Sequence, residues 1–200
     1  LRCVLERLRS QQPVRVVALG GSISAGLSFG IRKGAGGAWL YHAKVANALN
    51  VAFPPSPLSN GTARRHAHYN GALPATGPGF FELCLESRMP DGPIDLILLE
   101  FAANTEGRPD AFERLLRRLL SRPNPPGHAP PAIVVVNTHI FRLKGQYRMS
   151  CWKKSNKNQA TLIDSAVHRK EQTWEDKINF GDEDRLAEVA AHYGTPLVSV

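Results

Sequence analysis

The apolar residues of this chain follow two spacings in turn, and this alternation predicts strands and helices. Short runs rich in Val, Ile and Leu that end at Gly, Ala or Asn are typical of strands buried on both faces. Apolar residues at positions i, i+3, i+4 and i+7 are typical of amphipathic helices. We expect strands at Val14–Leu19, Arg65–Tyr69, Ile94–Phe101, Ala132–Thr138 and Pro196–Val200, and helices within residues 1–10, 39–50, 80–88, 112–119 and 182–193.

Strands that alternate with helices pair in parallel and are joined by right-handed crossovers. The pattern therefore predicts one α/β domain over residues 1–200, a three-layer α/β/α sandwich around a mostly parallel, flavodoxin-like sheet. Residues 141–180 are polar, basic and weakly periodic, and they exceed the connections typical of compact domains, so we interpret them as an insertion or a long loop. Because the chain stops where the last strand begins, we expect the domain to be incomplete at its C-terminus.

The composition excludes several classes of protein. With 42% hydrophobic and 21% charged residues, the chain resembles a folded globular domain and not a disordered or fibrous one. No apolar run approaches the roughly 20 residues that a membrane-spanning helix needs. The three cysteines are too few and too widely spaced for a zinc site, so we expect no metal.

The net charge of +8 is unevenly distributed. No acidic residue lies between Glu6 and Glu82, and a second basic cluster over residues 142–157 contains Tyr147 and Trp152. Basic and aromatic residues together suit contacts with nucleic acid. A solvated basic surface is the commoner explanation, so we expect no nucleic-acid partner. Cellular location and oligomeric state stay undetermined by the sequence.

Three polar clusters follow predicted strands, at the edge where ligands bind in parallel α/β folds. They are Gly20-Gly21-Ser22, the stretch from Asn70 to Gly77, and Asn104. A serine on a tight strand-to-helix turn can act as a nucleophile, while an amide and a loop N–H can hold a tetrahedral oxyanion. A simpler alternative is that the glycines only turn the chain and Ser22 caps a helix. Dinucleotide and NTP binding are disfavoured, because the glycine spacing, the lysine and the ribose-binding acid of those sites are missing.

These clusters resemble the conserved blocks of the SGNH hydrolases, or GDSL-type esterases. The block G-D-S-x-x-x-G is similar to residues 20–26, and G-x-N-D is similar to residues 102–105. The resemblance implies that Ser22 is the nucleophile and that the Ala75 N–H and the Asn104 amide are oxyanion donors. It also implies that Gly21, Asn70 and Gly77 contact the substrate and that no cofactor is needed.

The chain departs from the family pattern at several positions. Gly21 and Thr105 replace aspartates, and Ala75 and Ala102 replace glycines. The final block, D-x-x-H, which supplies the general base and its aspartate, is absent, and we expect it beyond the last residue. Within the chain, His139 is the best candidate for the base and for a substrate contact, because it follows a predicted strand. His66 and His68 are weaker candidates that would line the same cleft.

We therefore expect a serine-dependent hydrolase of carboxylic esters: an esterase, a lipase or a carbohydrate O-acetylesterase acting on a small-molecule or carbohydrate ester. The alternative is a catalytically inactive SGNH-like module that binds carbohydrate or an anionic polymer. The sequence does not identify the acyl group.

Overall fold

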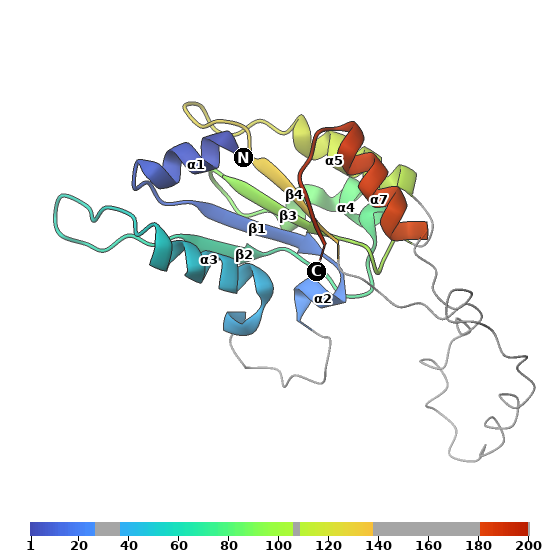
Figure 1. Ribbon diagram of the computed structural model, residues 1–200, viewed down its shortest axis with the longest axis horizontal. Helices are drawn as coiled ribbons and strands as arrows, with labels where there is room; N and C mark the ends of the chain where they lie inside the picture. Colours follow the sequence, from blue (N-terminus) through green and yellow to red (C-terminus); the bar gives the residue numbers. More distant parts are fainter. Residues whose placement is uncertain (27–36, 106–108, 138–180, 200) are drawn as a thin grey trace, which may run out of the picture. The chain divides into compact units, whose positions relative to one another are not determined.

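The computed structural model describes residues 1–26, 37–105, 109–137 and 181–199, and these form a parallel five-stranded sheet between layers of helices (Figure 1). The strand order is β2-β1-β3-β4-β5, and every neighbouring pair is parallel. This order is the predicted flavodoxin-like one. The strands are β1 (Arg15–Gly20), β2 (Ala67–Asn70), β3 (Leu96–Glu100), β4 (Ala132–Asn137) and β5 (Leu197–Ser199).

Helices cover both faces of the sheet, which confirms the predicted three-layer α/β/α sandwich. Helices α1 and α3 lie on one face, and α4, α5 and α7 lie on the other (Figure 1). A single turn, α2, follows β1 directly. The helices are α1 (Arg2–Arg9), α2 (Ser22–Ala25), α3 (Tyr41–Ala52), α4 (Pro78–Cys84), α5 (Pro109–Leu120) and α7 (Gly181–His192), with 3₁₀ turns at Gly37–Trp39 and Leu85–Arg88.

The central strands are mostly apolar because both of their faces are buried. Along β1, Val16 packs in the cluster beneath α1 and α3, whereas Val17 packs in the larger cluster beneath α4, α5 and α7. The same alternation places Leu98 and Leu99 of β3 in opposite clusters. Successive side chains of a strand point to opposite faces, so the side chains of one continuous apolar run pack into the cores on both faces of the sheet.

The edge strand β2 is shifted from its predicted range. It runs over Ala67–Asn70 and not over Arg65–Tyr69, and it pairs with β1 from the Arg15–Ala67 register onward. Three of its four residues are exposed, so it carries no apolar pattern that would define its ends. The proposed insertion at residues 141–180, and with it the second basic cluster, lies outside the described residues.

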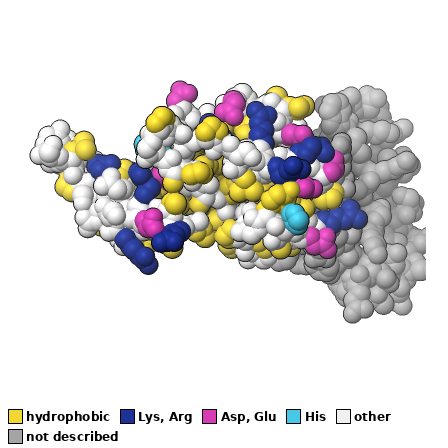
Figure 2. All heavy atoms as spheres, turned by 90° about the horizontal axis from the view of Figure 1, so that it is seen from above, with side chains coloured by type: hydrophobic (Ala, Val, Ile, Leu, Met, Phe, Trp, Pro, Cys, Tyr) yellow, Lys and Arg dark blue, Asp and Glu magenta, His cyan; other side chains and the backbone are white. Residues whose placement is uncertain are grey.

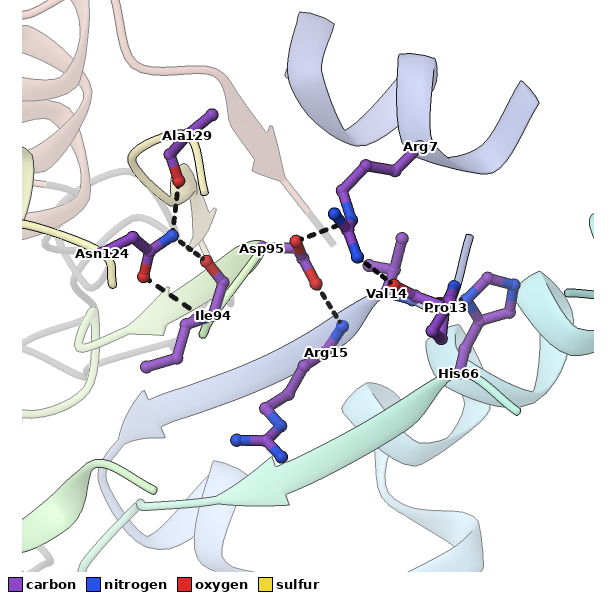
Figure 3. A network of polar contacts seen from close by, with 9 residues as sticks. All are labelled: Arg7, Pro13, Val14, Arg15, His66, Ile94, Asp95, Asn124 and Ala129. Carbon is purple, nitrogen blue, oxygen red and sulfur yellow. Dashed lines mark hydrogen bonds and ion pairs between the residues drawn. The ribbon is translucent and has the colours of Figure 1, made fainter. Parts of the chain in front are cut away.

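A polar network ties together the amino ends of the strands (Figure 3). Arg7 of α1 forms an ion pair with Asp95, Nε to Oδ1, at 3.0 Å, and Asp95 Oδ2 accepts a hydrogen bond from the Arg15 N–H at 2.7 Å. His66 accepts from the Val14 N–H through Nδ1 at 2.9 Å and donates to the Phe53 carbonyl through Nε2 at 2.7 Å. His66 is therefore a buried structural residue at the amino edge, and it does not line the predicted cleft.

Arginine side chains on the surface are partly neutralised by neighbouring acids. On the face seen in Figure 2, basic and acidic side chains are interspersed. Arg114 pairs with Glu82 at 2.7 Å and with Asp110 at 2.9 Å, and Arg122 pairs with Glu86 at 3.1 Å. In the described part of the chain, no helix is both long and apolar enough to cross a bilayer.

Candidate active site

The predicted site residues meet at the carboxyl edge of the sheet because their strands are neighbours. Strand β1 ends at Gly20 and leads into α2, whose first residue is Ser22. Strand β2 ends at Asn70, and Asn104 lies four residues beyond β3. Since β1 lies between β2 and β3, all three polar clusters reach the same part of this edge.

The turn that carries Ser22 is short and sharply ended. Helix α2 has four residues, and Gly26 closes it in the left-handed conformation at φ +85°. Ser22 is partly exposed, and among the described residues its hydroxyl has no hydrogen-bond partner. The hydroxyl is thus available to a ligand that approaches the sheet edge.

The two glycines before Ser22 are required by close packing. A Cβ atom on Gly20 would lie 2.5 Å from the Glu100 carbonyl oxygen and 2.6 Å from Ser24 Oγ. A Cβ atom on Gly21 would lie 2.0 Å from Asn104 Oδ1. The φ of Gly21 is −85°, a value open to any residue, so space and not backbone conformation excludes a side chain there.

The loop from Asn70 to Gly77 contacts both the turn that carries Ser22 and the residue Asn104. Asn70 donates through Nδ2 to the Ser24 carbonyl at 3.1 Å, and its Oδ1 accepts from the Ala72 N–H at 3.1 Å. A Cβ atom on Gly77 would lie 2.4 Å from the Asn104 carbonyl oxygen. Asn104 therefore contacts the serine turn through its side chain and the second loop through its backbone.

Ala75 lies at the exposed tip of this loop. Its φ is +57°, the left-handed region that favours glycine. This conformation gives a physical reason for the glycine that the family commonly has here. An alanine can adopt it, but at a cost in stability.

A pocket of about 410 Å³ opens beside Asn104, between α4 and α5. Asn104 and Thr105 form part of its wall, Phe80 and Leu83 supply apolar surface, and Glu82 and Arg114 supply charge. The wall of this pocket thus combines polar, charged and apolar groups. Another cavity, of about 240 Å³, lies near Arg7 and Asp95 at the amino edge, away from the three clusters.

A buried polar network lies beneath the serine turn, and the sequence did not point to it. Glu100 and Ser24 are fully buried and joined by a hydrogen bond of 3.0 Å between Oε2 and Oγ. Tyr41 Oη lies 2.9 Å from Ser24 Oγ, and burial, together with the charge of Glu100, raises the pKa of Tyr41. In the sequence, Glu100 gives an indication of this network, because it is an acid at the end of an otherwise apolar strand.

His42, also in this network, is held in its neutral form. Its Nε2 donates to the Ser24 carbonyl at 3.2 Å, and its ring lies 5.1 Å from that of His68. The Nδ1 atom is buried and has no partner among the described residues. Burial lowers the pKa of His42, and the nearby His68 lowers it further, which the Ser24 hydrogen bond only partly offsets.

The structure thus brings together Ser22, Gly21, Asn70, Gly77 and Asn104. Ala75 belongs to the same loop, while His139 lies outside the described residues. His68 is exposed and contacts His42. Across the described ranges, no group of three His, Cys, Asp or Glu residues is arranged to hold a metal ion.

Comparison with known proteins shows a shared fold. No family model matches the chain, and no curated protein matches it in sequence. The crystal structure of a two-domain esterase (CEX) active on acetylated mannans matches 100% of this chain at 17% identity, with a TM-score of 0.64. A mutant of the esterase AlinE4 matches 94% of this chain and 76% of its own, at 16% identity and a TM-score of 0.51.

The chain spans 40% of the length of the two-domain esterase. At these identities the likeness shows a fold shared with these esterases and nothing beyond the fold. The resemblance found in the sequence is thereby confirmed at the level of the fold.

Proposed function

We propose that this domain hydrolyses carboxylic esters with Ser22 as the nucleophile. The observation that carries the proposal is the position of Asn104. Its side chain lies against Gly21, next to Ser22, and its backbone lies against Gly77, at the end of the loop that contains Ala75. Asn104 thus connects the three polar clusters of the sequence. These clusters contain the groups that we propose as the nucleophile and the oxyanion donors.

In the proposed reaction, Ser22 Oγ attacks the carbonyl carbon of the ester while a general base takes its proton. The negative charge that develops on the carbonyl oxygen is stabilised by the N–H of Ser22, the N–H of Ala75 and the side-chain amide of Asn104. Collapse of the tetrahedral intermediate expels the alcohol and leaves an acyl group on Ser22. Water then attacks this acyl-enzyme, which releases the acid and restores the serine.

The general base of this reaction is not assigned. None of the histidines that the structure describes hydrogen-bonds to Ser22. His42 is committed to Ser24, and His66 is committed to Val14 and Phe53. His139 remains a candidate outside the described residues.

For the substrate, we propose an acetyl ester of a carbohydrate. The two-domain esterase with the same fold acts on acetylated mannans, and it has also been crystallised with mannopentaose. The pocket beside Asn104 offers surfaces that a sugar requires, namely the Phe80 ring and the polar groups of Glu82 and Arg114. A sugar seated there would lie next to Asn104, one of the three proposed oxyanion donors.

The proposal is tested by labelling the full-length protein with a fluorophosphonate and mapping the adduct by mass spectrometry. We expect the adduct on Ser22, its loss in Ser22→Ala, and normal labelling in the control Ser87→Ala, whose hydroxyl only caps the Cys84 carbonyl. Acetate release from acetylated mannan should follow the same pattern. A folded protein that takes up no label and releases no acetate would instead favour a catalytically inactive binding module. Titration with deacetylated mannan would then test whether the protein binds carbohydrate.

A further inference from the structure

Glu100 is a buried acid for which the proposed reaction has no use. It is the last residue of β3 and is fully buried, and it is the only acidic residue among the buried polar side chains of the described ranges. Burying a carboxylate is costly unless hydrogen bonds compensate for the lost water. Two of the hydrogen bonds that compensate Glu100 come from the turn that carries Ser22.

Ser24 supplies two donors to the same carboxylate oxygen. Its N–H lies 3.3 Å from Glu100 Oε2, and its hydroxyl lies 3.0 Å from the same atom. In both bonds Ser24 is the donor and the carboxylate oxygen accepts. The Ser24 oxygen then accepts from the phenol of Tyr41, at 2.9 Å. The resulting chain of donors runs from Tyr41 through Ser24 to Glu100.

The remaining polar group of Ser24 is held as well. Its carbonyl accepts from His42 Nε2 at 3.2 Å and from Asn70 Nδ2 at 3.1 Å. Ser24 lies two residues after Ser22 in the single turn of α2. Strand β3, helix α3 and strand β2 therefore all hold this turn through one residue, and no polar atom of that residue is left to water.

We propose that Glu100 is a positioning residue for Ser22: through Ser24 it holds the serine turn in the geometry needed for nucleophilic attack. This role rests on the proposed function. The sequence has Gly21 where the pattern that it resembles has an aspartate beside the nucleophile. The acid that supports the turn comes instead from β3, about 80 residues further along the chain.

Two variants separate this role from general stability. Glu100→Gln keeps the size of the side chain but removes the charge, and Ser24→Ala removes one hydroxyl oxygen. We expect each to lower the rate of fluorophosphonate labelling at Ser22, and kcat for an acetyl ester, by about 10- to 100-fold, because small misplacements of reacting groups are costly. KM should change by less than about threefold, because substrate contacts stay in place.

The matched control is Glu86→Gln, an exposed acid that pairs with Arg122 on the surface. It should label and turn over like the wild type. Amide hydrogen exchange of the segment 21–26 gives a second readout that needs no substrate. Glu100→Gln and Ser24→Ala should speed exchange there, while exchange in β1 and β3 stays slow.

The outcomes are distinct. Folded variants with normal labelling, normal kcat and unchanged exchange would overturn the positioning role while leaving Ser22 as the nucleophile. If Glu100→Gln does not fold, the same comparison with Ser24→Ala decides the matter. A wild type that neither labels nor hydrolyses esters would overturn the proposed function and the positioning role together, even where exchange shows that Glu100 orders the turn.

Discussion

The side chain of Asn104 lies so close to the Cα of Gly21 that a Cβ atom at position 21 would be 2.0 Å from Asn104 Oδ1. Real side-chain atoms do not approach one another to that distance. Gly21, which precedes the candidate nucleophile, and Asn104, the candidate oxyanion donor, therefore constrain each other, although they are 83 positions apart. The contact joins the turn after β1 to the turn after β3.

Gly21→Ala should destabilise the protein because its methyl group overlaps with the Asn104 amide. We expect a loss of about 1–3 kcal/mol in the free energy of unfolding, the usual range for overpacking. Urea denaturation measures it. The control is Gly79→Ala in α4, where the new methyl group would lie 3.9 Å from Ala111 Cβ, so no loss is expected.

The same contact can be tested by a double-mutant cycle. Adding Asn104→Ala to Gly21→Ala removes the overlapping atoms and should restore most of the lost stability. If the losses of stability measured for the two single variants simply add in the double variant, overlap with Asn104 is not what excludes a side chain at position 21.

Asn104→Ala should slow ester hydrolysis without unfolding the protein. Loss of one oxyanion donor typically lowers kcat by about 10²–10³-fold. The fold should persist because Asn104 Oδ1 makes no hydrogen bond within the described residues, and the Asn104 N–H keeps its bond to the Phe101 carbonyl. Steady-state kinetics together with circular dichroism would check both expectations. Unchanged turnover would remove Asn104 from the proposed oxyanion site.

Ala75→Gly should stabilise the protein slightly. Ala75 has φ +57°, and its side chain is exposed, so glycine relieves backbone strain without loss of packing. The gain should be about 0.5–1 kcal/mol, the strain relieved less the extra entropy of the unfolded glycine. Thermal denaturation compares Ala75→Gly with Ala63→Gly, a change at an exposed position without positive φ. The Ala63→Gly variant should be no more stable than the wild type. Equal effects at both positions would contradict the strain at Ala75.

His42 should make stability depend on pH. Its pKa in the folded protein lies below the ordinary value of about 6.5, so at acid pH the unfolded chain takes up a proton before the folded one does. The contribution is complete above about pH 6.5 and is lost as the pH falls through the pKa of folded His42. Denaturation between pH 7.5 and 5.5, about a unit either side of the ordinary histidine pKa, measures the slope.

The variant His42→Gln keeps a donor near the Ser24 carbonyl but cannot titrate, so its pH slope should be smaller. His192→Gln, an exposed control, should keep the slope of the wild type. Identical slopes for the wild type and His42→Gln would show that His42 does not carry the effect.

Much of the architecture could be predicted because it depends on local patterns. The apolar run Leu96–Leu99 and the helical spacing of Phe112, Leu115 and Leu119 indicate their elements without reference to the rest of the chain. The rule that parallel strands meet a ligand at their carboxyl ends then places Ser22 and Asn104 at one edge. The exposed residues of the edge strand β2 carry no such pattern, and its range is shifted from the predicted one.

Other features were decided only by the tertiary structure. The position of His66 at the amino edge, the exclusion of a side chain at Gly21 and the link between Glu100 and Ser24 all depend on atoms that are far apart in sequence. Composition and periodicity report whether a residue is buried, but not which group lies 3 Å from it. The sequence by itself therefore determined the class of fold and the edge at which we expect the chemistry. The packing between loops decided which side chains fit there and what holds the serine turn.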